Sequence, residues 1–304
     1  MPPERLQLDE DRLVWIMGSS RSGSTWLLRM LCELDDAVGI DDPHLGHHLG
    51  VWRPIPLAWA VAAERPEPTT LLDVKREKQG YLFNERYEET WRPLLRELIL
   101  GRFAAQAGER SGPVFVKEPG SQAAGLILSL FPGSRLVFLL RDGRDVVDSW
   151  LAAYQDGSWA QEEGAFPLAP EGREAFIRWQ ASVWAHRTRE VAHAFGRHDP
   201  ARRVLVRYED LLGEPALHLS RICEAIGKAP DHERLAAIAD KHDIAAVPDT
   251  AKGEARAIRA AEPGGWRRRL TPREQRIAME ELAQTLVSFG YPIRKDRAQR
   301  LSAA

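Results

Sequence analysis

The sequence predicts an α/β protein: a three-layer fold with a mostly parallel, doubly wound sheet. Short apolar runs rich in β-branched and aromatic residues alternate with segments of helical spacing. The runs lack polar alternation, which indicates strands buried on both faces. The first run enters a glycine- and serine-rich turn, a pattern typical of P-loop-like phosphate-binding segments. With 304 residues and 44% apolar content, we expect a single domain over residues 1–304.

The expected elements alternate along the chain. Four runs have strand character, at residues 13–17, 114–117, 135–140 and 203–208. Three segments have helical spacing, at residues 25–33, 121–130 and 171–195. Because strands that alternate with helices pair in parallel, their carboxyl ends are expected at one edge of the sheet.

Two segments interrupt the alternation. Five prolines break up residues 40–80, so no regular element is expected there. An irregular insertion at the carboxyl end of a parallel sheet is a common place for a ligand, and we expect this one to line an acceptor pocket or to pack as plain surface. Residues 154–170 contain Gly157, Gly164 and Pro167, and are expected to form a loop that acts as a mobile lid.

The charge balance excludes some partners. The formal net charge is −2 and the isoelectric point about 6.5, so no global basic field attracts nucleic acid or an acidic membrane. The start of the sequence is charged, and no apolar run reaches the roughly 18 residues that a membrane span needs. Cys32 and Cys223 have no metal-binding spacing. We therefore expect a cytoplasmic protein with no nucleic-acid partner and no membrane span.

The turn after the first strand, Gly18-Ser-Ser-Arg-Ser-Gly-Ser-Thr25, has the frame of a Walker A loop. It differs at Ser24, where a nucleoside triphosphatase has lysine, and it offers Arg21 as a cation instead. Glycines allow the backbone to aim N–H groups inward, and the following helix adds its N-terminal partial charge. An ordinary glycine turn is the alternative, but the flanking strand and helix favour an anion site.

Residues 21–27, Arg-Ser-Gly-Ser-Thr-Trp-Leu, closely resemble the first signature of the nucleotide-dependent sulfotransferases. The resemblance implies a loop that holds the 5′-phosphosulfate of 3′-phosphoadenosine 5′-phosphosulfate (PAPS), the sulfuryl donor. It also implies that Trp26 lies against the adenine. The loop residues that would hold the phosphosulfate are Arg21, Ser22, Gly23, Ser24 and Thr25.

The third run ends in Arg141-Asp-Gly-Arg-Asp-Val-Val-Asp-Ser149. An arginine at the strand end and a serine two helical turns later can face one anion. The second signature of the same family has this pair, which implies that Arg141 and Ser149 bind the donor's 3′-phosphate. The alternative is a solvated helix start in which Arg141 and Arg144 pair with the neighbouring aspartates.

Two later motifs also resemble the family. The fourth run ends in Tyr-Glu-Asp, which implies that Tyr208 contacts the adenine. Residues 259–267, Arg-Ala-Ala-Glu-Pro-Gly-Gly-Trp-Arg, resemble a loop that closes over the 3′-phosphate. Arg259 and Gly264 match this loop, whereas the alanines at 260 and 261 depart from it.

The alternative for this last motif is an exposed arginine-rich turn. It would precede a helix that begins after Thr271, because Thr271 and Glu274 have the spacing of a capping box.

Sulfuryl transfer needs cations for the leaving phosphate and a base for the acceptor. Arg21 is one candidate cation, and Lys117 matches a position where the family often has lysine near the sulfuryl group. Some members use a histidine two residues later as the base, but here that residue is Pro119. No metal is expected.

Other branches of the family use a glutamate some way after the first helix as the base. The equivalent stretch is residues 39–44, which makes Asp42 the first candidate, with Asp41 close behind. His44 is the second candidate because histidine titrates near neutral pH, and Glu118 is the third because it follows Lys117 at the strand end.

The sequence therefore predicts a sulfotransferase that transfers a sulfuryl group from PAPS to a hydroxyl or amine of a small-molecule or carbohydrate acceptor. The product would be adenosine 3′,5′-bisphosphate (PAP). The alternatives are a P-loop kinase, which Ser24 disfavours, and an inactive nucleotide-binding module. Aromatic residues that would suit a sugar or an aromatic acceptor are Trp52, Trp59, Tyr81 and Trp159.

Overall fold

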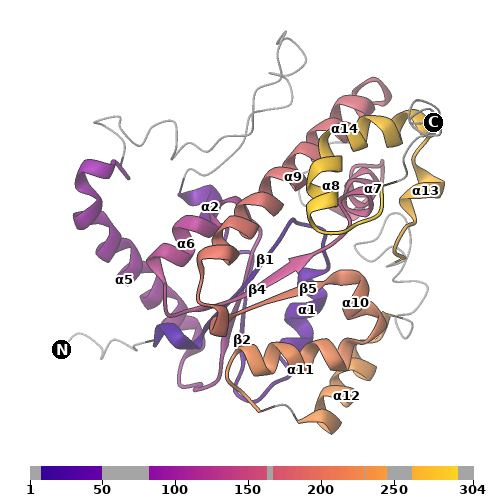
Figure 1. Ribbon diagram of the computed structural model, residues 1–304. Helices are drawn as coiled ribbons and strands as arrows, with labels where there is room; N and C mark the ends of the chain where they lie inside the picture. The colour runs from indigo at the N-terminus through magenta and orange to yellow at the C-terminus, as the bar shows by residue number, and fades with distance from the viewer. Residues whose placement is uncertain (1–7, 50–81, 163–166, 230, 245–261, 294–304) are drawn as a thin grey trace, which may run out of the picture.

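A computed structural model of the chain describes residues 8–49, 82–162, 167–229, 231–244 and 262–293. Within these ranges five parallel strands form one sheet in the order β2-β3-β1-β4-β5 (Figure 1). The strands are β1 (Leu13–Met17), β2 (Val38–Asp41), β3 (Val114–Glu118), β4 (Arg135–Leu140) and β5 (Arg203–Arg207). The strand order reverses around β1, and crevices for ligands form at such reversals, at the carboxyl ends of the strands.

Helices cover both faces of the sheet (Figure 1). The α-helices are α1 (Ser24–Leu31), α2 (Leu45–His48), α5 (Glu88–Ala107), α6 (Ala124–Leu130), α7 (Gly143–Ala153), α8 (Trp159–Glu162), α9 (Arg173–Arg197), α10 (Tyr208–Gly213), α11 (Pro215–Ala225), α12 (His232–Lys241), α13 (Trp266–Arg269) and α14 (Pro272–Ser288). Short 3-10 helices are η1 (Glu10–Arg12), η2 (Glu85–Tyr87), η3 (Ser121–Ala123), η4 (Pro170–Gly172) and η5 (Pro200–Arg202). No helix in the described ranges is long and apolar enough to cross a membrane.

The central strand supplies both halves of the core. Side chains alternate across a strand, so Trp15 packs with the helices on one face and Ile16 with those on the other. The Trp15 side of the core includes residues of α5, α6, α7, α9 and α14, and the Ile16 side includes residues of α1, α11 and α12. Every residue of β1 and β3 is buried, which explains why β1 and the first three residues of β3 are continuously apolar.

The predicted fold class is confirmed, and all four predicted strands are present. The strand β2, at the edge beside β3, was not predicted. The predicted helix over residues 121–130 begins as η3 and continues as α6, and the one over 171–195 lies at Arg173–Arg197 after a 3-10 turn. The predicted capping box at Thr271 and Glu274 is confirmed at the start of α14.

The two segments predicted to be irregular are described in part. Residues 40–49 include the end of β2 and the short helix α2, whereas residues 50–80 lie outside the described residues, together with Trp52 and Trp59. Tyr81 lies outside them as well. Residues 154–170 contain the single-turn helix α8, and the Leu168 N–H donates to the Tyr154 carbonyl at 2.9 Å.

Candidate active site

The loop between β1 and α1 turns through two left-handed residues. Arg21 has φ 69° and Gly23, which caps α1, has φ 86°. The first N–H groups of a helix have no acceptor inside the helix, so the start of α1 adds donors and a partial positive charge to the loop. These features suit an anion at the carboxyl end of β1.

Neighbouring elements hold this loop tightly. The Ser121 hydroxyl donates to the Gly18 carbonyl at 2.6 Å. A Cβ at Gly18 would lie 2.0 Å from the Leu139 carbonyl oxygen, and a Cβ at Gly23 would lie 2.6 Å from the Tyr208 ring. Close packing therefore requires glycine at both positions, and at Gly23 the left-handed backbone conformation requires it as well.

We predict that Gly23→Ala destabilises the protein and weakens nucleotide binding. The left-handed conformation alone costs an alanine about 1–2 kcal/mol, and the new methyl group also displaces Tyr208. Thermal unfolding with and without PAP measures both effects. Gly101→Ala in α5 is the matched control, because its Cβ would meet nothing within 4 Å and the helix would gain propensity. Equal stability of the two variants would contradict the packing argument.

The structure brings Arg21, Arg141 and Ser149 together beside the loop. Nε of Arg21 donates to the Ser149 hydroxyl at 3.1 Å, and Nη1 of Arg141 donates to the Arg21 carbonyl at 2.8 Å. The Arg21 guanidinium lies 5.0 Å from the centre of the Trp159 ring. The segment expected to act as a lid therefore contacts the predicted phosphate loop through α8.

Two aromatic residues border the same loop. The Arg141 guanidinium lies 4.4 Å from the centre of the Tyr208 ring, and the Trp26 and Tyr208 rings meet edge to face at 6.2 Å. The Trp26 indole donates to the His242 carbonyl at 2.8 Å, which fixes its orientation. Burial raises the pKa of Tyr208, so its hydroxyl stays neutral.

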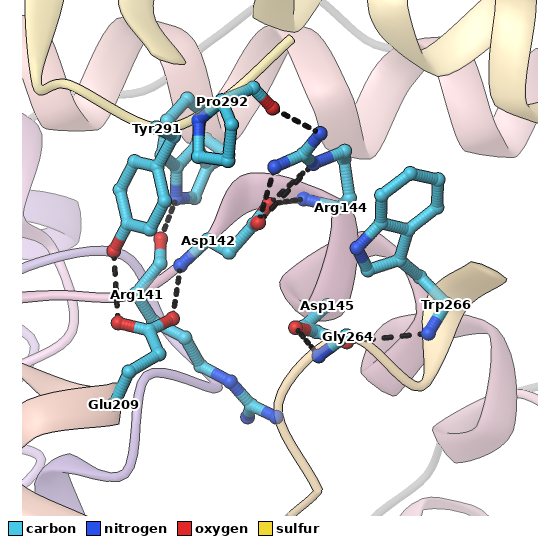
Figure 2. Close-up of polar contacts among 10 residues, drawn as sticks. Arg141, Asp142, Arg144, Asp145, Glu209, Gly264, Trp266, Tyr291 and Pro292 are labelled. Carbon is cyan, nitrogen blue, oxygen red and sulfur yellow. Dashed lines mark hydrogen bonds and ion pairs between the residues drawn. The ribbon is translucent and has the colours of Figure 1, made fainter. Parts of the chain in front are cut away.

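The start of α7 is held by buried polar contacts (Figure 2). Arg144 pairs with Asp142 at 2.6 Å, and the Asp142 N–H donates to Glu209 at 2.9 Å. The Trp184 indole donates to the Arg141 carbonyl at 3.1 Å. The alternative prediction, in which an arginine pairs with an aspartate at the helix start, thus holds for Arg144 and Asp142, but this pair is buried and not solvated. Arg141 points instead to the loop.

The segment with Gly264 lies against α7. Asp145 accepts hydrogen bonds from the N–H groups of Gly264 at 2.7 Å and Trp266 at 3.3 Å (Figure 2). The Gly264 N–H is therefore engaged by Asp145, and Gly264 itself has the left-handed φ of 80° that favours glycine. Arg259 lies outside the described residues.

A second cluster surrounds Lys117 at the end of β3. Its buried ammonium contacts Asp41 at 2.6 Å and Asp42 at 2.9 Å, and it donates to the Thr25 hydroxyl at 2.7 Å. Asp41 pairs with Lys117 in the β2–β3 register, and Asp42 has φ 50° at the turn that follows. The structure therefore joins one predicted cation, one predicted base and the predicted phosphate loop.

The other two candidate bases differ in their surroundings. Glu118 is 1% exposed, and its two oxygens accept from the N–H groups of Leu45, Gly46 and Gly120. Burial raises the pKa of Glu118, although these three N–H groups act in the opposite direction. Its carboxylate thus holds the start of α2. His44 is exposed, and its ring meets that of His47 at 5.4 Å.

Sequence reasoning missed Arg187, in the middle of α9. This buried arginine donates to the Ser20 hydroxyl of the loop at 2.9 Å and to the Gln122 side chain at 3.0 Å. A basic residue in an amphipathic helix is usually part of a solvated face, so no sequence pattern distinguished Arg187 from the other arginines of α9. Arg187 thus links α9 to the loop between β1 and α1.

The fold and this loop define a parallel α/β protein with a glycine- and serine-rich turn between its first strand and first helix. The chain matches the sequence profile of the Sulfotransferase family over residues 14–231, and it belongs to that family. As a member it is a transferase of the sulfuryl-transfer type. No curated protein matches the chain.

Solved structures that share the fold include two sulfotransferases. The sulfotransferase STF9 from Mycobacterium avium is 16% identical, with a TM-score of 0.57 and coverage of 96% of this chain and 80% of that one. The mouse sulfotransferase SULT7A1, solved in complex with PAP, is 12% identical, with a TM-score of 0.53 and coverage of 93% of this chain and 91% of that one. At these identities the likeness concerns the fold alone.

Proposed function

We propose that this sulfotransferase transfers a sulfuryl group from PAPS to a hydroxyl or amine of a small-molecule or carbohydrate acceptor. The observation that carries the proposal is that the carboxyl ends of the strands bring together two sets of cationic and hydroxyl side chains. One is the loop that contains Arg21, Ser22 and Thr25, and the other is the pair Arg141 and Ser149. A nucleotide with anionic groups at both the 5′ and the 3′ position fits this arrangement.

Unsatisfied polar atoms support a ligand at this place. Among the described residues, the Ser22 hydroxyl and Nε of Arg141 are buried and have no hydrogen-bond partner. Such atoms are costly unless a ligand or water engages them. We propose that the loop holds the 5′ end, that Arg141 and Ser149 hold the 3′-phosphate, and that Trp26 and Tyr208 border the adenine. The structure of mouse SULT7A1 with PAP agrees with this choice of nucleotide.

When bound, the donor would supply a sulfuryl group attached to a phosphate leaving group. The chain would contribute Lys117 and Arg21 as cations at the loop, where charge develops on that phosphate. Asp42 would accept the acceptor's proton, because it is half exposed and lies next to Lys117. Glu118 is less suited, since its oxygens are engaged by backbone N–H groups. His44 is the remaining alternative.

A labelled-transfer experiment tests the proposal. The protein is incubated with a cell extract and PAPS whose sulfur carries an isotopic label, and products are sought that have gained the label and roughly 80 mass units. The label is needed because phosphoryl transfer adds nearly the same mass. The matched control is the Arg141→Gln variant, which should give far less product. Unlabelled products that form only with ATP and Mg²⁺ would support the kinase alternative and overturn the proposal.

A further inference from the structure

The segment over residues 262–270 is attached to α7 at three points. Asp145 accepts from the N–H groups of Gly264 and Trp266, as described above. Asp148 forms an ion pair with Arg269 at 2.7 Å. The Arg144 guanidinium lies 4.5 Å from the centre of the Trp266 ring. Arg144, Asp145 and Asp148 of α7 therefore fix the position of the segment.

Asp145 lies in the first turn of α7, four residues after Arg141, which precedes the helix, and one turn before Ser149. Residues spaced by four face the same side of a helix, so the carboxylate that holds the segment shares a side of α7 with the Ser149 hydroxyl. Asp145 is 1% exposed, so its contacts are shielded from water. Burial raises the pKa of Asp145, and the Gly264 N–H and the Arg141 charge oppose that rise. The positive charge of Arg141 therefore acts on the same carboxylate that holds the segment.

We propose that Asp145 is a positioning residue for the 3′-phosphate end of the donor site, because its carboxylate fixes the 262–270 segment against α7, the helix that carries Ser149. The carboxylate also lies within reach of the Arg141 charge. The inference rests on the proposed donor. It assigns no contact between Asp145 and the donor. Instead, Asp145 sets the distance between α7 and the segment, and with it the space in which a 3′-phosphate lies. The loop after β1, which would hold the 5′ end, does not depend on this contact.

The test compares nucleotides with and without a 3′-phosphate. Calorimetric titration measures the dissociation constants of PAP and AMP for the wild type and for Asp145→Asn. The asparagine keeps the size of the side chain but replaces one charged acceptor oxygen with an amide group that cannot accept. We expect the dissociation constant of PAP to rise about tenfold, and that of AMP to change by less than about twofold. With PAPS as substrate, KM should rise while kcat changes little.

Glu274→Gln is the matched control. Glu274 is also a buried carboxylate that accepts from a backbone N–H, but it belongs to the cap of α14 and pairs with Arg173. Its replacement should lower the unfolding temperature and leave the ratio of PAP to AMP affinity unchanged. A purely structural role of Asp145 would give the same result as this control, and would overturn the inference.

The outcomes separate this inference from the proposed function. If the wild type binds PAP no more tightly than AMP, the proposed donor is wrong. If the wild type prefers PAP and Asp145→Asn keeps the full preference, only the positioning role is wrong. Should Asp145→Asn fail to fold, Asp148→Asn loosens the same segment at Arg269, and we expect a PAP-selective loss of about threefold. An unchanged preference in that folded variant would also overturn the inference.

Discussion

Arg141→Gln is expected to weaken PAP binding by about a hundredfold, because the charge-assisted hydrogen-bond donor proposed for the 3′-phosphate is lost. Nε of Arg141 is buried without a partner among the described residues, and the same side chain holds the Arg21 carbonyl. The loss of this second contact should also weaken AMP binding, but only by a few fold. Calorimetric titration with the two nucleotides separates the two effects.

Arg135→Gln provides the control for this prediction. Arg135 is the first residue of β4, the strand that Arg141 follows, so it lies at the amino end of the strand. Its guanidinium donates to the Ala225 carbonyl. Its replacement should leave the affinity for PAP within about twofold of the wild type. A folded Arg141→Gln variant that binds PAP as tightly as Arg135→Gln would exclude Arg141 from the 3′-phosphate site.

Asp42→Asn is expected to lower kcat by about 10²–10⁴-fold, the usual effect of a general base, while PAP affinity stays within about twofold. Asparagine tolerates the left-handed backbone of this position, so the turn after β2 should be kept. Initial rates at saturating PAPS measure kcat, and titration with PAP measures the affinity.

Asp41→Asn is the matched variant, because Asp41 contacts the same ammonium of Lys117. If charge balance at Lys117 were all that mattered, the two variants would lose activity equally. We expect Asp41→Asn to lose less than about tenfold. A large loss in His44→Gln or Glu118→Gln, together with an active Asp42→Asn variant, would assign the base to one of those residues instead.

The sequence predicted the elements that are stabilised by local pattern. The strands β1, β3 and β4 are continuous apolar runs because both of their faces are covered, and such runs are visible without any structure. The strand β2 has only four residues, one of them Gly39, and it pairs with β3 alone within the described sheet. Its strand conformation depends on that pairing, and no local pattern of the sequence encodes it.

The same contrast applies to the site. That the loop, Arg141 and Lys117 lie together could be predicted, because each is at the end of a parallel strand and the carboxyl ends of such strands meet at one side of the sheet. The contacts between distant segments could not, since Asp145 and Gly264 are 119 residues apart and Arg187 and Ser20 are 167 apart. Glu118 was predicted as a candidate base, whereas the structure shows its oxygens engaged by backbone N–H groups, a role that depends on how α2 packs.

The most direct test of the proposed donor site is a thermal unfolding experiment with PAP, AMP, ATP–Mg²⁺ and buffer alone. A ligand at a hundred times its dissociation constant stabilises the native state by about 2.7 kcal/mol, which is readily detected. The proposed donor site predicts strong stabilisation by PAP, weaker stabilisation by AMP and little by ATP–Mg²⁺, because Ser24 replaces the Walker lysine and Arg141 and Ser149 are proposed to bind a 3′-phosphate. Strong stabilisation by ATP–Mg²⁺ with none by PAP would contradict it.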